Sequence, residues 1–369
     1  MRLARRLSHF WWLLSILICA SAHAQSGQQR AEAAGHDLVG SPAPRMVLKT
    51  IDGEAIDLGS LYGKKAVYLK FWATWCVPCR EQMPHFERTY ESAGSDLAVI
   101  AVNAGFNDSI DDVRAYRKQL GIRMPIVIDD GTLGAALNLR VTPQHVVIGR
   151  DGRIQYVGHL ANERLDAAIQ AARTSPAIGA PGGNDGRGGA SKTSRYEPGD
   201  QAPQLSATTL DGSQFDLRQP EHPIDPGHPT QSGHPIQSGP PTESGHPAVL
   251  VFLSPWCESY LETSRAAVSA KCREVRLQVD ALAKQHPGVR WLGIASGLWA
   301  TKADLGKYQT DYKVTIPLTL DESGALFRKF QVRNVPTVIV VDTHGRIERR
   351  IEGNDPRLPA DLQVVTLGK

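Results

Sequence analysis

Two cysteines three residues apart, Cys76 and Cys79, are the side chains of this sequence best suited to covalent chemistry. An apolar run over residues 66–72 precedes them, and helix-forming residues follow. Spacing of i, i+3 on the first turn of a helix places both sulfurs on one face, close enough to bond. Cys76 would lie at the helix N-terminus, where unpaired N–H groups and the helix dipole stabilise a thiolate. Pro78 suits this first turn, where its missing N–H costs nothing.

Reversible dithiol/disulfide exchange competes with two other interpretations of this pair. Structural zinc needs four ligands, and the sequence around Cys76 and Cys79 offers no second Cys or His pair at the usual spacing. A purely structural disulfide would close a loop too short to constrain the unfolded chain much. The pattern therefore favours redox exchange, with no metal and no other cofactor.

Length, charge and the N-terminus limit the class of protein. A chain of 369 residues predicts two domains, and 41 basic against 38 acidic residues give no case for a nucleic-acid partner. Three arginines, an apolar run over residues 10–20 and Ala22-His-Ala24 predict a signal peptide over residues 1–24 and a periplasmic location. An uncleaved anchor facing the periplasm is the alternative. Four cysteines would remain after cleavage, too few for a disulfide scaffold.

Composition and pattern divide the rest of the chain. Residues 25–38 are polar and Ala-rich, which predicts a disordered lead-in. Strands alternate with helices over residues 39–173 and predict an α/β domain, a central sheet with helices on both faces. Residues 174–195 are rich in Gly, Ser and Pro and predict a flexible linker. Residues 196–369 complete the chain as a second domain.

The second domain repeats the first imperfectly. Thr209-Leu-Asp-Gly212 matches Thr50-Ile-Asp-Gly53, and Trp256-Cys257 matches Trp75-Cys76, which predicts two domains of one fold. An insertion at about 219–247 carries a His-Pro hexapeptide period and predicts a disordered, low-complexity loop. Its histidines raise the alternative of metal binding, but nothing in the pattern fixes their geometry.

The motif Phe71-Trp-Ala-Thr-Trp-Cys-Val-Pro-Cys79, preceded by Gly-x-x-Ala-Pro and Asp-Gly, resembles exported thioredoxin-like proteins of the TlpA/ResA type. The resemblance covers residues 40–160 well and residues 197–353 more weakly. It implies tandem thioredoxin-like folds, each with a mixed sheet, an added hairpin and a cis-proline loop. The implied activity is thiol–disulfide exchange on disulfide-containing proteins, with a membrane thiol reductase as electron donor.

The resemblance also assigns roles at the first domain's site. Cys76 is expected to be the exposed, attacking thiolate and Cys79 the resolving thiol. Trp75 would flank the site as an apolar platform for substrate. Pro143 matches the family's cis-proline, which would place the backbone of Thr142 beside the cysteines, where it can pair with an extended substrate strand.

Two positions depart from the family pattern. Lys70 stands where thioredoxin has a buried acid, and this lysine either extends outward to solvent or lowers the pKa of the resolving thiol through its charge. Gln82 stands where many relatives carry an acidic residue, with Glu81 beside it. A proton relay would then need backbone groups, water or Glu81.

The second domain lacks the second cysteine of the motif, since Tyr260 occupies that position. Cys272 lies fifteen residues after Cys257, a distance of roughly 22 Å if one helix joined them. Three interpretations stay open: a Cys257–Cys272 disulfide, a degenerate domain that only binds a partner, and monothiol chemistry. Pro336 retains the cis-proline signature.

The sequence thus predicts an exported, tandem thioredoxin-fold oxidoreductase that reduces periplasmic disulfides through Cys76 and Cys79. A disulfide oxidase or isomerase would use the same site in the other direction. A peroxiredoxin-like peroxidase and a partner-binding scaffold are further alternatives.

Overall fold

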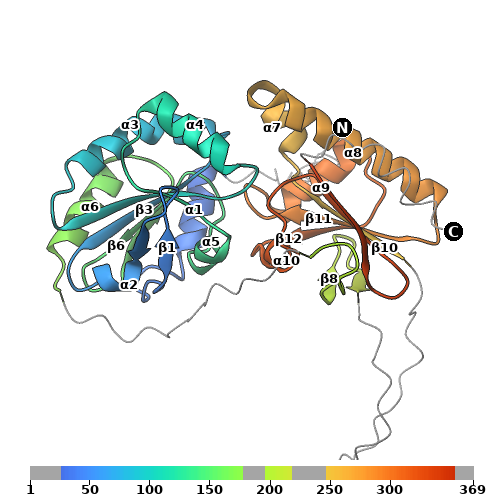
Figure 1. Cartoon of the computed structure of the whole chain (residues 1–369), viewed down its shortest axis with the longest axis horizontal. Helices are drawn as coiled ribbons and strands as arrows, with labels where there is room; N and C mark the ends of the chain where they lie inside the picture. Colours follow the sequence, from blue (N-terminus) through green and yellow to red (C-terminus); the bar gives the residue numbers. More distant parts are fainter. Residues whose placement is uncertain (1–25, 178–195, 218–246, 354–369) are drawn as a thin grey trace, which may run out of the picture.

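The chain is described by a computed structural model that covers residues 26–177, 196–217 and 247–353. Two α/β domains lie side by side (Figure 1). The predicted signal peptide, nearly all of the predicted linker and the His-Pro insertion lie outside the described residues.

The first domain is built on a five-stranded mixed sheet in the order β5-β4-β3-β6-β7. Its strands are β3 (Ala66–Trp72), β4 (Leu97–Asn103), β5 (Ile126–Ile128), β6 (Gln144–Ile148) and β7 (Ile154–Gly158). Strand β3 pairs parallel to β4 and antiparallel to β6. A separate hairpin, β1 (Val47–Lys49) and β2 (Ala55–Asp57), precedes the sheet, as predicted.

Strand β3 is the central strand of the sheet, and all seven of its residues are buried. A strand covered on both faces reads as a continuous apolar run, which is the pattern that the sequence shows. Successive side chains alternate between faces. Tyr68 and Trp72 belong to one buried cluster, and Leu69 and Phe71 belong to another on the opposite face.

Helices cover both faces of this sheet (Figure 1): α2 (Leu58–Leu61), α3 (Val77–Glu91), α4 (Ile110–Leu120), α5 (Thr132–Ala136) and α6 (Glu163–Thr174). Their starts follow the sequence. Ser109 caps α4 in a reciprocal capping box with Asp112, and Asn162 caps α6. Helix α4 ends at Gly121, whose φ of 65° suits glycine.

The second domain repeats the topology, with the strand order β12-β11-β10-β13-β14. These strands are β10 (Ala248–Leu253), β11 (Arg290–Ser296), β12 (Leu318–Asp321), β13 (Thr337–Val341) and β14 (Ile347–Glu352), after a hairpin of β8 (Leu205–Thr208) and β9 (Gln214–Leu217). Its helices are α7 (Cys257–Ser264), α8 (Ala266–Gln285), α9 (Lys302–Asp311) and α10 (Ala325–Lys329). The prediction of two copies of one fold is confirmed by the two sheets.

The predicted disordered lead-in is wrong where the structure describes it, because helix α1 (Gly27–Gly35) forms there. Ser26 and Gln29 make a capping box at its start, and Ala31 and Ala34 are buried. Gly35 packs against Val157 of β7. A short polar helix is unstable alone, so the tertiary contact with β7 stabilises it.

Candidate active site

The two cysteines lie at the N-terminus of α3, as their spacing predicts. Cys76 is the N-cap residue, and its Sγ accepts a hydrogen bond from the Cys79 N–H at 3.2 Å. A disulfide joins the two residues, with their Cα atoms 5.2 Å apart. Pro78 occupies the first turn, where no intrahelical N–H is needed. On reduction, the unpaired N–H groups of this helix end would stabilise a thiolate at Cys76.

The loop before β6 holds the predicted cis peptide bond, Thr142-Pro143, and the second domain has its counterpart at Val335-Pro336. Thr142 is fully buried. The His159 Nδ1–H donates to the Pro143 carbonyl oxygen at 2.7 Å and ties the loop to β7.

Lys70 is fully buried beside the cysteine pair, so the interpretation in which it extends to solvent is wrong. Its Nζ donates to the Cys79 carbonyl oxygen at 3.5 Å and lies 5.3 Å from the centre of the Phe86 ring. Burial lowers the pKa of Lys70 from 10.5 to about 7. A lysine with this pKa exchanges a proton near neutral pH.

Gln82 belongs to a buried chain of hydrogen bonds behind the cysteines. Its Oε1 accepts from His145 Nε2–H at 2.8 Å, and its Nε2 donates to the His159 carbonyl oxygen at 3.1 Å. Because His145 uses Nε2–H in this bond, its Nδ1 accepts from the Tyr68 hydroxyl at 2.8 Å. Burial holds the pKa of His145 well below its usual range. The network therefore positions Gln82 with a neutral imidazole and contains no carboxylate.

The expectation that Cys76 is exposed is wrong for this arrangement of the chain, because its exposed fraction is 1%. Trp75, predicted as an open platform, is 3% exposed. Its indole N–H donates to the Phe106 carbonyl oxygen at 2.8 Å, and its ring stacks on Trp256 of the second domain at 4.9 Å. The second domain thus covers the platform.

The second domain's cysteines form a disulfide, Cys257–Cys272, with their Cα atoms 6.2 Å apart. The chain breaks its helical course at Arg265, between α7 and α8, and folds Cys272 back against Cys257. Of the three interpretations left open, the bonded pair is therefore present. Pro336 lies at the cis bond of this domain.

Sequence reasoning missed a group of residues that join the two domains: Phe106, Asn107, Asp108, Arg265 and Trp299. Asn107 and Trp299 both follow a buried strand and both have a positive φ, of 55° and 63°. A non-glycine residue with positive φ marks a turn with a specific purpose. The repeat of the two domains would align these positions, but their contact appears only in the folded chain.

Neither a metal site nor a membrane-spanning helix appears among the described residues. No group of three or more His, Cys, Asp or Glu side chains gathers where one ion could bind in residues 26–177, 196–217 and 247–353. Within the same ranges, every helix is too short or too polar to cross a bilayer.

A CxxC pair capping a helix beside a cis-proline, on a mixed sheet with helices on both faces, defines a thioredoxin-fold thiol–disulfide oxidoreductase. Residues 39–157 match the AhpC/TSA family. Thioredoxin-like protein YneN of Bacillus subtilis is 37% identical over 133 residues, 35% of this chain and 78% of that protein. Thiol-disulfide oxidoreductase ResA of Bacillus subtilis is 33% identical over 158 residues, 42% of this chain and 85% of that protein.

Among solved structures, a thioredoxin-family thiol:disulfide interchange protein from Chlorobium tepidum TLS is 27% identical, with a TM-score of 0.33 over 36% of this chain and 97% of that one. By the similarity of its sequence to ResA and YneN, the chain belongs to the ResA-like thiol–disulfide oxidoreductases of the redoxin superfamily.

Proposed function

We propose that this protein is exported and reduces disulfide bonds of periplasmic proteins through a Cys76/Cys79 dithiol cycle, with a membrane thiol reductase returning the pair to the dithiol. The observation that carries the proposal is the cysteine pair at the N-terminus of α3, with Cys76 as the N-cap. The relatives named as thiol-disulfide oxidoreductases support the chemistry. The arginines, apolar run and Ala-x-Ala of residues 1–24 support export.

The first half of the cycle is attack by the Cys76 thiolate on a substrate disulfide. A new bond forms between Cys76 Sγ and one substrate sulfur, and the other substrate sulfur leaves as a thiolate. The helix N-terminus favours Cys76 as the attacking group because it stabilises the negative charge. Cys79, three residues on, is buried behind it and serves as the resolving thiol.

The second half needs a base for the Cys79 thiol, and Lys70 is suited to that role. Its buried amine lies against the Cys79 peptide and has a pKa of about 7, so much of it is neutral at that pH. The neutral amine takes the Cys79 proton as Cys79 attacks Cys76. The Cys76–Cys79 disulfide forms, the second substrate sulfur leaves as a thiolate, and Lys70 becomes an ammonium.

Trapping in the native host tests the function. In Cys79→Ser the mixed disulfide at Cys76 cannot resolve, so covalent complexes should accumulate and disappear on treatment with dithiothreitol. Mass spectrometry of these complexes identifies the substrates. Cys76→Ser is the matched control, because it leaves Cys79 as the single thiol of the motif and should trap little. Equal trapping by the two variants would contradict the assigned roles.

The oxidase and peroxidase alternatives make different predictions. An oxidase would be trapped in complexes with newly translocated proteins whose cysteines are still reduced. Its Cys76–Cys79 pair would have an oxidising reduction potential. A peroxidase would consume peroxide in the Cys79→Ser variant. The proposal expects neither result.

A further inference from the structure

The two domains meet through a reciprocal pair of backbone hydrogen bonds. The Asn107 N–H donates to the Arg333 carbonyl oxygen at 2.9 Å, and the Trp299 N–H donates to the Arg140 carbonyl oxygen at 3.0 Å. Asn107 and Trp299 follow equivalent strands, and Arg140 and Arg333 each lie three residues before their domain's cis-proline. Reciprocal contacts of this kind are typical of an interface between two copies of one fold related by a two-fold axis.

The second domain covers the helix end that bears Cys76. Trp256 stacks on Trp75 with the ring planes 30° apart, and the Tyr260 hydroxyl accepts from the Val77 N–H at 3.2 Å. Val77 is the first residue of α3, directly after Cys76. The donor that would otherwise face an incoming anionic group is therefore occupied.

The second domain also occupies the cis-proline loop. The Trp299 indole N–H donates to the Thr142 hydroxyl at 3.0 Å, and the indole ring meets the His159 ring edge-on at 5.7 Å. On the other side, Asn107 Oδ1 accepts from the Val335 N–H at 2.8 Å. Each domain thus contacts the residue before the other's cis-proline, the place where an extended substrate strand would pair.

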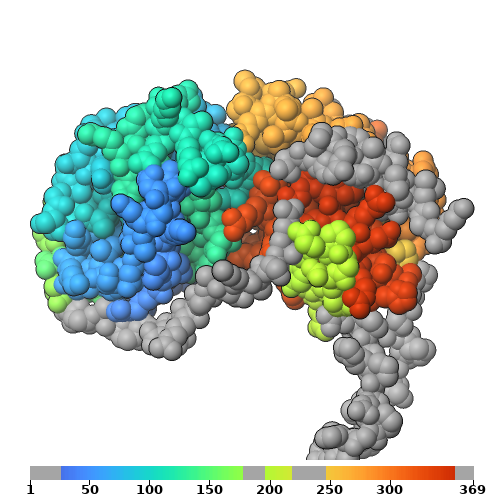
Figure 2. All heavy atoms as spheres, in the orientation of Figure 1, coloured from blue at the N-terminus to red at the C-terminus, as the bar shows by residue number. Residues whose placement is uncertain are grey.

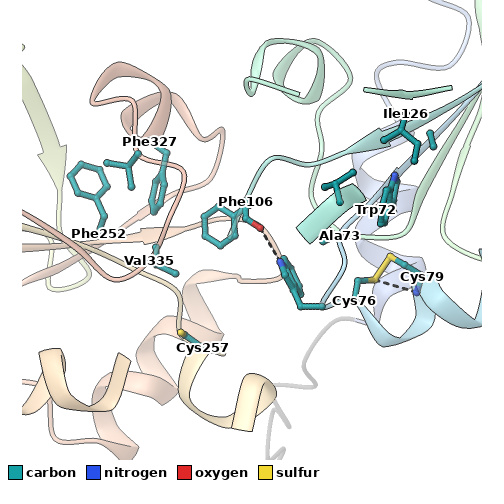
Figure 3. Packing of buried hydrophobic residues seen from close by; sticks show 14 of the residues in the cluster. Trp72, Ala73, Cys76, Cys79, Phe106, Ile126, Phe252, Cys257, Phe327 and Val335 are labelled. Atoms are coloured by element: carbon teal, nitrogen blue, oxygen red, sulfur yellow. Dashed lines mark hydrogen bonds between the residues drawn. A yellow bond between two sulfur atoms is a disulfide. The ribbon is translucent and has the colours of Figure 1, made fainter. Parts of the chain in front are cut away.

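A buried core and a buried ion pair hold this interface together. The Phe106 ring lies 6.1 Å from Trp256 and 5.9 Å from Phe327, and Figure 3 shows it between the Cys76 side and the Phe327 side of one continuous apolar cluster. Arg265 pairs with Asp108 at 2.9 Å, where the aspartate side chain is fully buried and the arginine 21% exposed. Apolar anchors and paired buried charges are the features that carry interface affinity.

In the described part of the chain, a pocket between the domains borders Cys76. The pocket has a volume of about 430 Å³ and is lined by Thr74, Cys76, Arg80, Tyr116, Ser264 and Arg265 among others. This volume suits a small molecule. An extended polypeptide would in addition need the strand position beside Thr142, which Trp299 fills. The space-filling view shows the two domains in contact along this boundary (Figure 2).

We propose that the second domain acts as an intramolecular ligand of the catalytic face, the surface of the first domain formed by Trp75, Val77 and Thr142 around Cys76. While bound there, it admits small thiols to Cys76 and excludes protein disulfides. Protein disulfides reach Cys76 only when the domains separate. The proposal rests on the proposed function for its physiological meaning, but not for its test. In the closed chain a small dithiol reduces Cys76–Cys79 by two exchanges, leaving two protein thiols and one oxidised reductant. A protein substrate must first displace the second domain.

Size-dependent labelling of the full-length, reduced protein tests this inference. Cys76 is labelled with N-ethylmaleimide or with a maleimide on a polyethylene glycol chain, and the rates are read at Cys76 by peptide mass spectrometry. The double variant Trp299→Ala/Tyr260→Ala removes two contacts of the second domain and leaves the pocket lining intact. We expect the ratio of the small-reagent rate to the large-reagent rate to fall about tenfold in this variant, a change in closure of about 1.4 kcal/mol.

Two control variants test whether a change in the ratio of labelling rates comes from the contact between the domains. Tyr312→Ala removes an aromatic ring that packs on Tyr308 inside the second domain, and it should leave the ratio unchanged. Trp299→Phe keeps an aromatic ring but loses the indole N–H, and it should give an intermediate ratio. Equal rates for both reagents in the unaltered protein would overturn the inference. So would a ratio that the double variant does not change. Labelling does not require turnover, so a failure of the proposed redox function would instead appear as absent substrate reduction with the size ratio intact.

Discussion

At the scale of single residues, the proposed cycle assigns to Lys70 the removal of the proton from the Cys79 thiol. It occupies the face of β3 toward α3, where Phe86 and the Cys79 peptide surround it. No carboxylate pairs with Lys70 among the described residues, and burial alone keeps its pKa near 7. Above pH 7 most of the Lys70 amine is therefore neutral and can accept a proton. In a protein with an acidic residue at this position, a carboxylate could accept the proton instead.

Replacing Lys70 by Met should slow resolution of a mixed disulfide by on the order of 100-fold at pH 8, the usual contribution of a positioned base. Release of the second thionitrobenzoate after reaction with Ellman's reagent measures this step. In the unaltered protein the rate should rise with pH through about 7 and then level, as Lys70 becomes neutral. Lys70→Met should lose this inflection, and an unchanged profile would rule out the assigned role.

Lys70→Met should also change how the free energy of unfolding depends on pH, and this measurement checks that the variant folds. The pKa of Lys70 is lower in the folded chain than in the unfolded one. Between pH values of about 7 and 10.5 the unfolded state therefore binds more protons, and the free energy of unfolding rises with pH. Below pH 7 the folded state carries the full penalty of a buried charge. Lys70→Met should therefore stabilise the protein more at pH 6 than at pH 10, by up to a few kcal/mol at about 1.4 kcal/mol per pKa unit.

At the scale of elements, the Cys257–Cys272 disulfide joins the start of α7 to α8 across the break at Arg265. Closing a loop with a sequence separation of 15 residues restricts the unfolded chain and contributes about 3 kcal/mol. Cys272→Ser should lower the free energy of unfolding of the second domain by this amount in urea titrations under oxidising conditions. The difference from the unaltered protein should vanish in dithiothreitol, and a difference that persists there would assign the effect to lost packing.

The elements that the sequence predicts well are those with strong local signals. Strand β3 coincides with the apolar run that the sequence shows over residues 66–72, and a capping box in the sequence marks the start of helix α4. Helix α1 was missed because its polar, Ala-rich sequence has no apolar period and depends on tertiary contacts. Arg30 of α1 shows this dependence, since it pairs at 2.7 Å with Asp304 of α9 in the second domain.

The candidate site divides in the same way. Cys76 and Cys79 follow from a local motif and its spacing, and Pro143 follows from the resemblance to TlpA/ResA-type proteins, so their positions could be predicted. The burial of Cys76 could not, because the residues that cover it belong to the other domain. Trp299 and Tyr260 are ordinary aromatic residues in the sequence, and only the pairing of the two domains places them over the catalytic face.

At the scale of the whole molecule, the chain contains two copies of one fold. The first copy carries the CxxC disulfide, and the second copy lacks the CxxC motif. The second copy retains the topology, the cis-proline and the turn after β11, which matches the turn after β4 in the first domain. The cis-proline loop and this turn both contact the first domain, as do Trp256, Tyr260 and Arg265. The second domain therefore contacts the first, although it has Tyr260 at the position of the motif's second cysteine.

The reduction potential of the Cys76–Cys79 pair separates a disulfide reductase from a disulfide oxidase. The full-length protein is equilibrated with defined ratios of reduced to oxidised dithiothreitol and glutathione, and the redox state of this pair is read by alkylation and peptide mass spectrometry. A disulfide reductase should give a value near that of thioredoxin, about −270 mV. A value of about −120 mV, as in strong periplasmic oxidants, would contradict the assignment as a reductase.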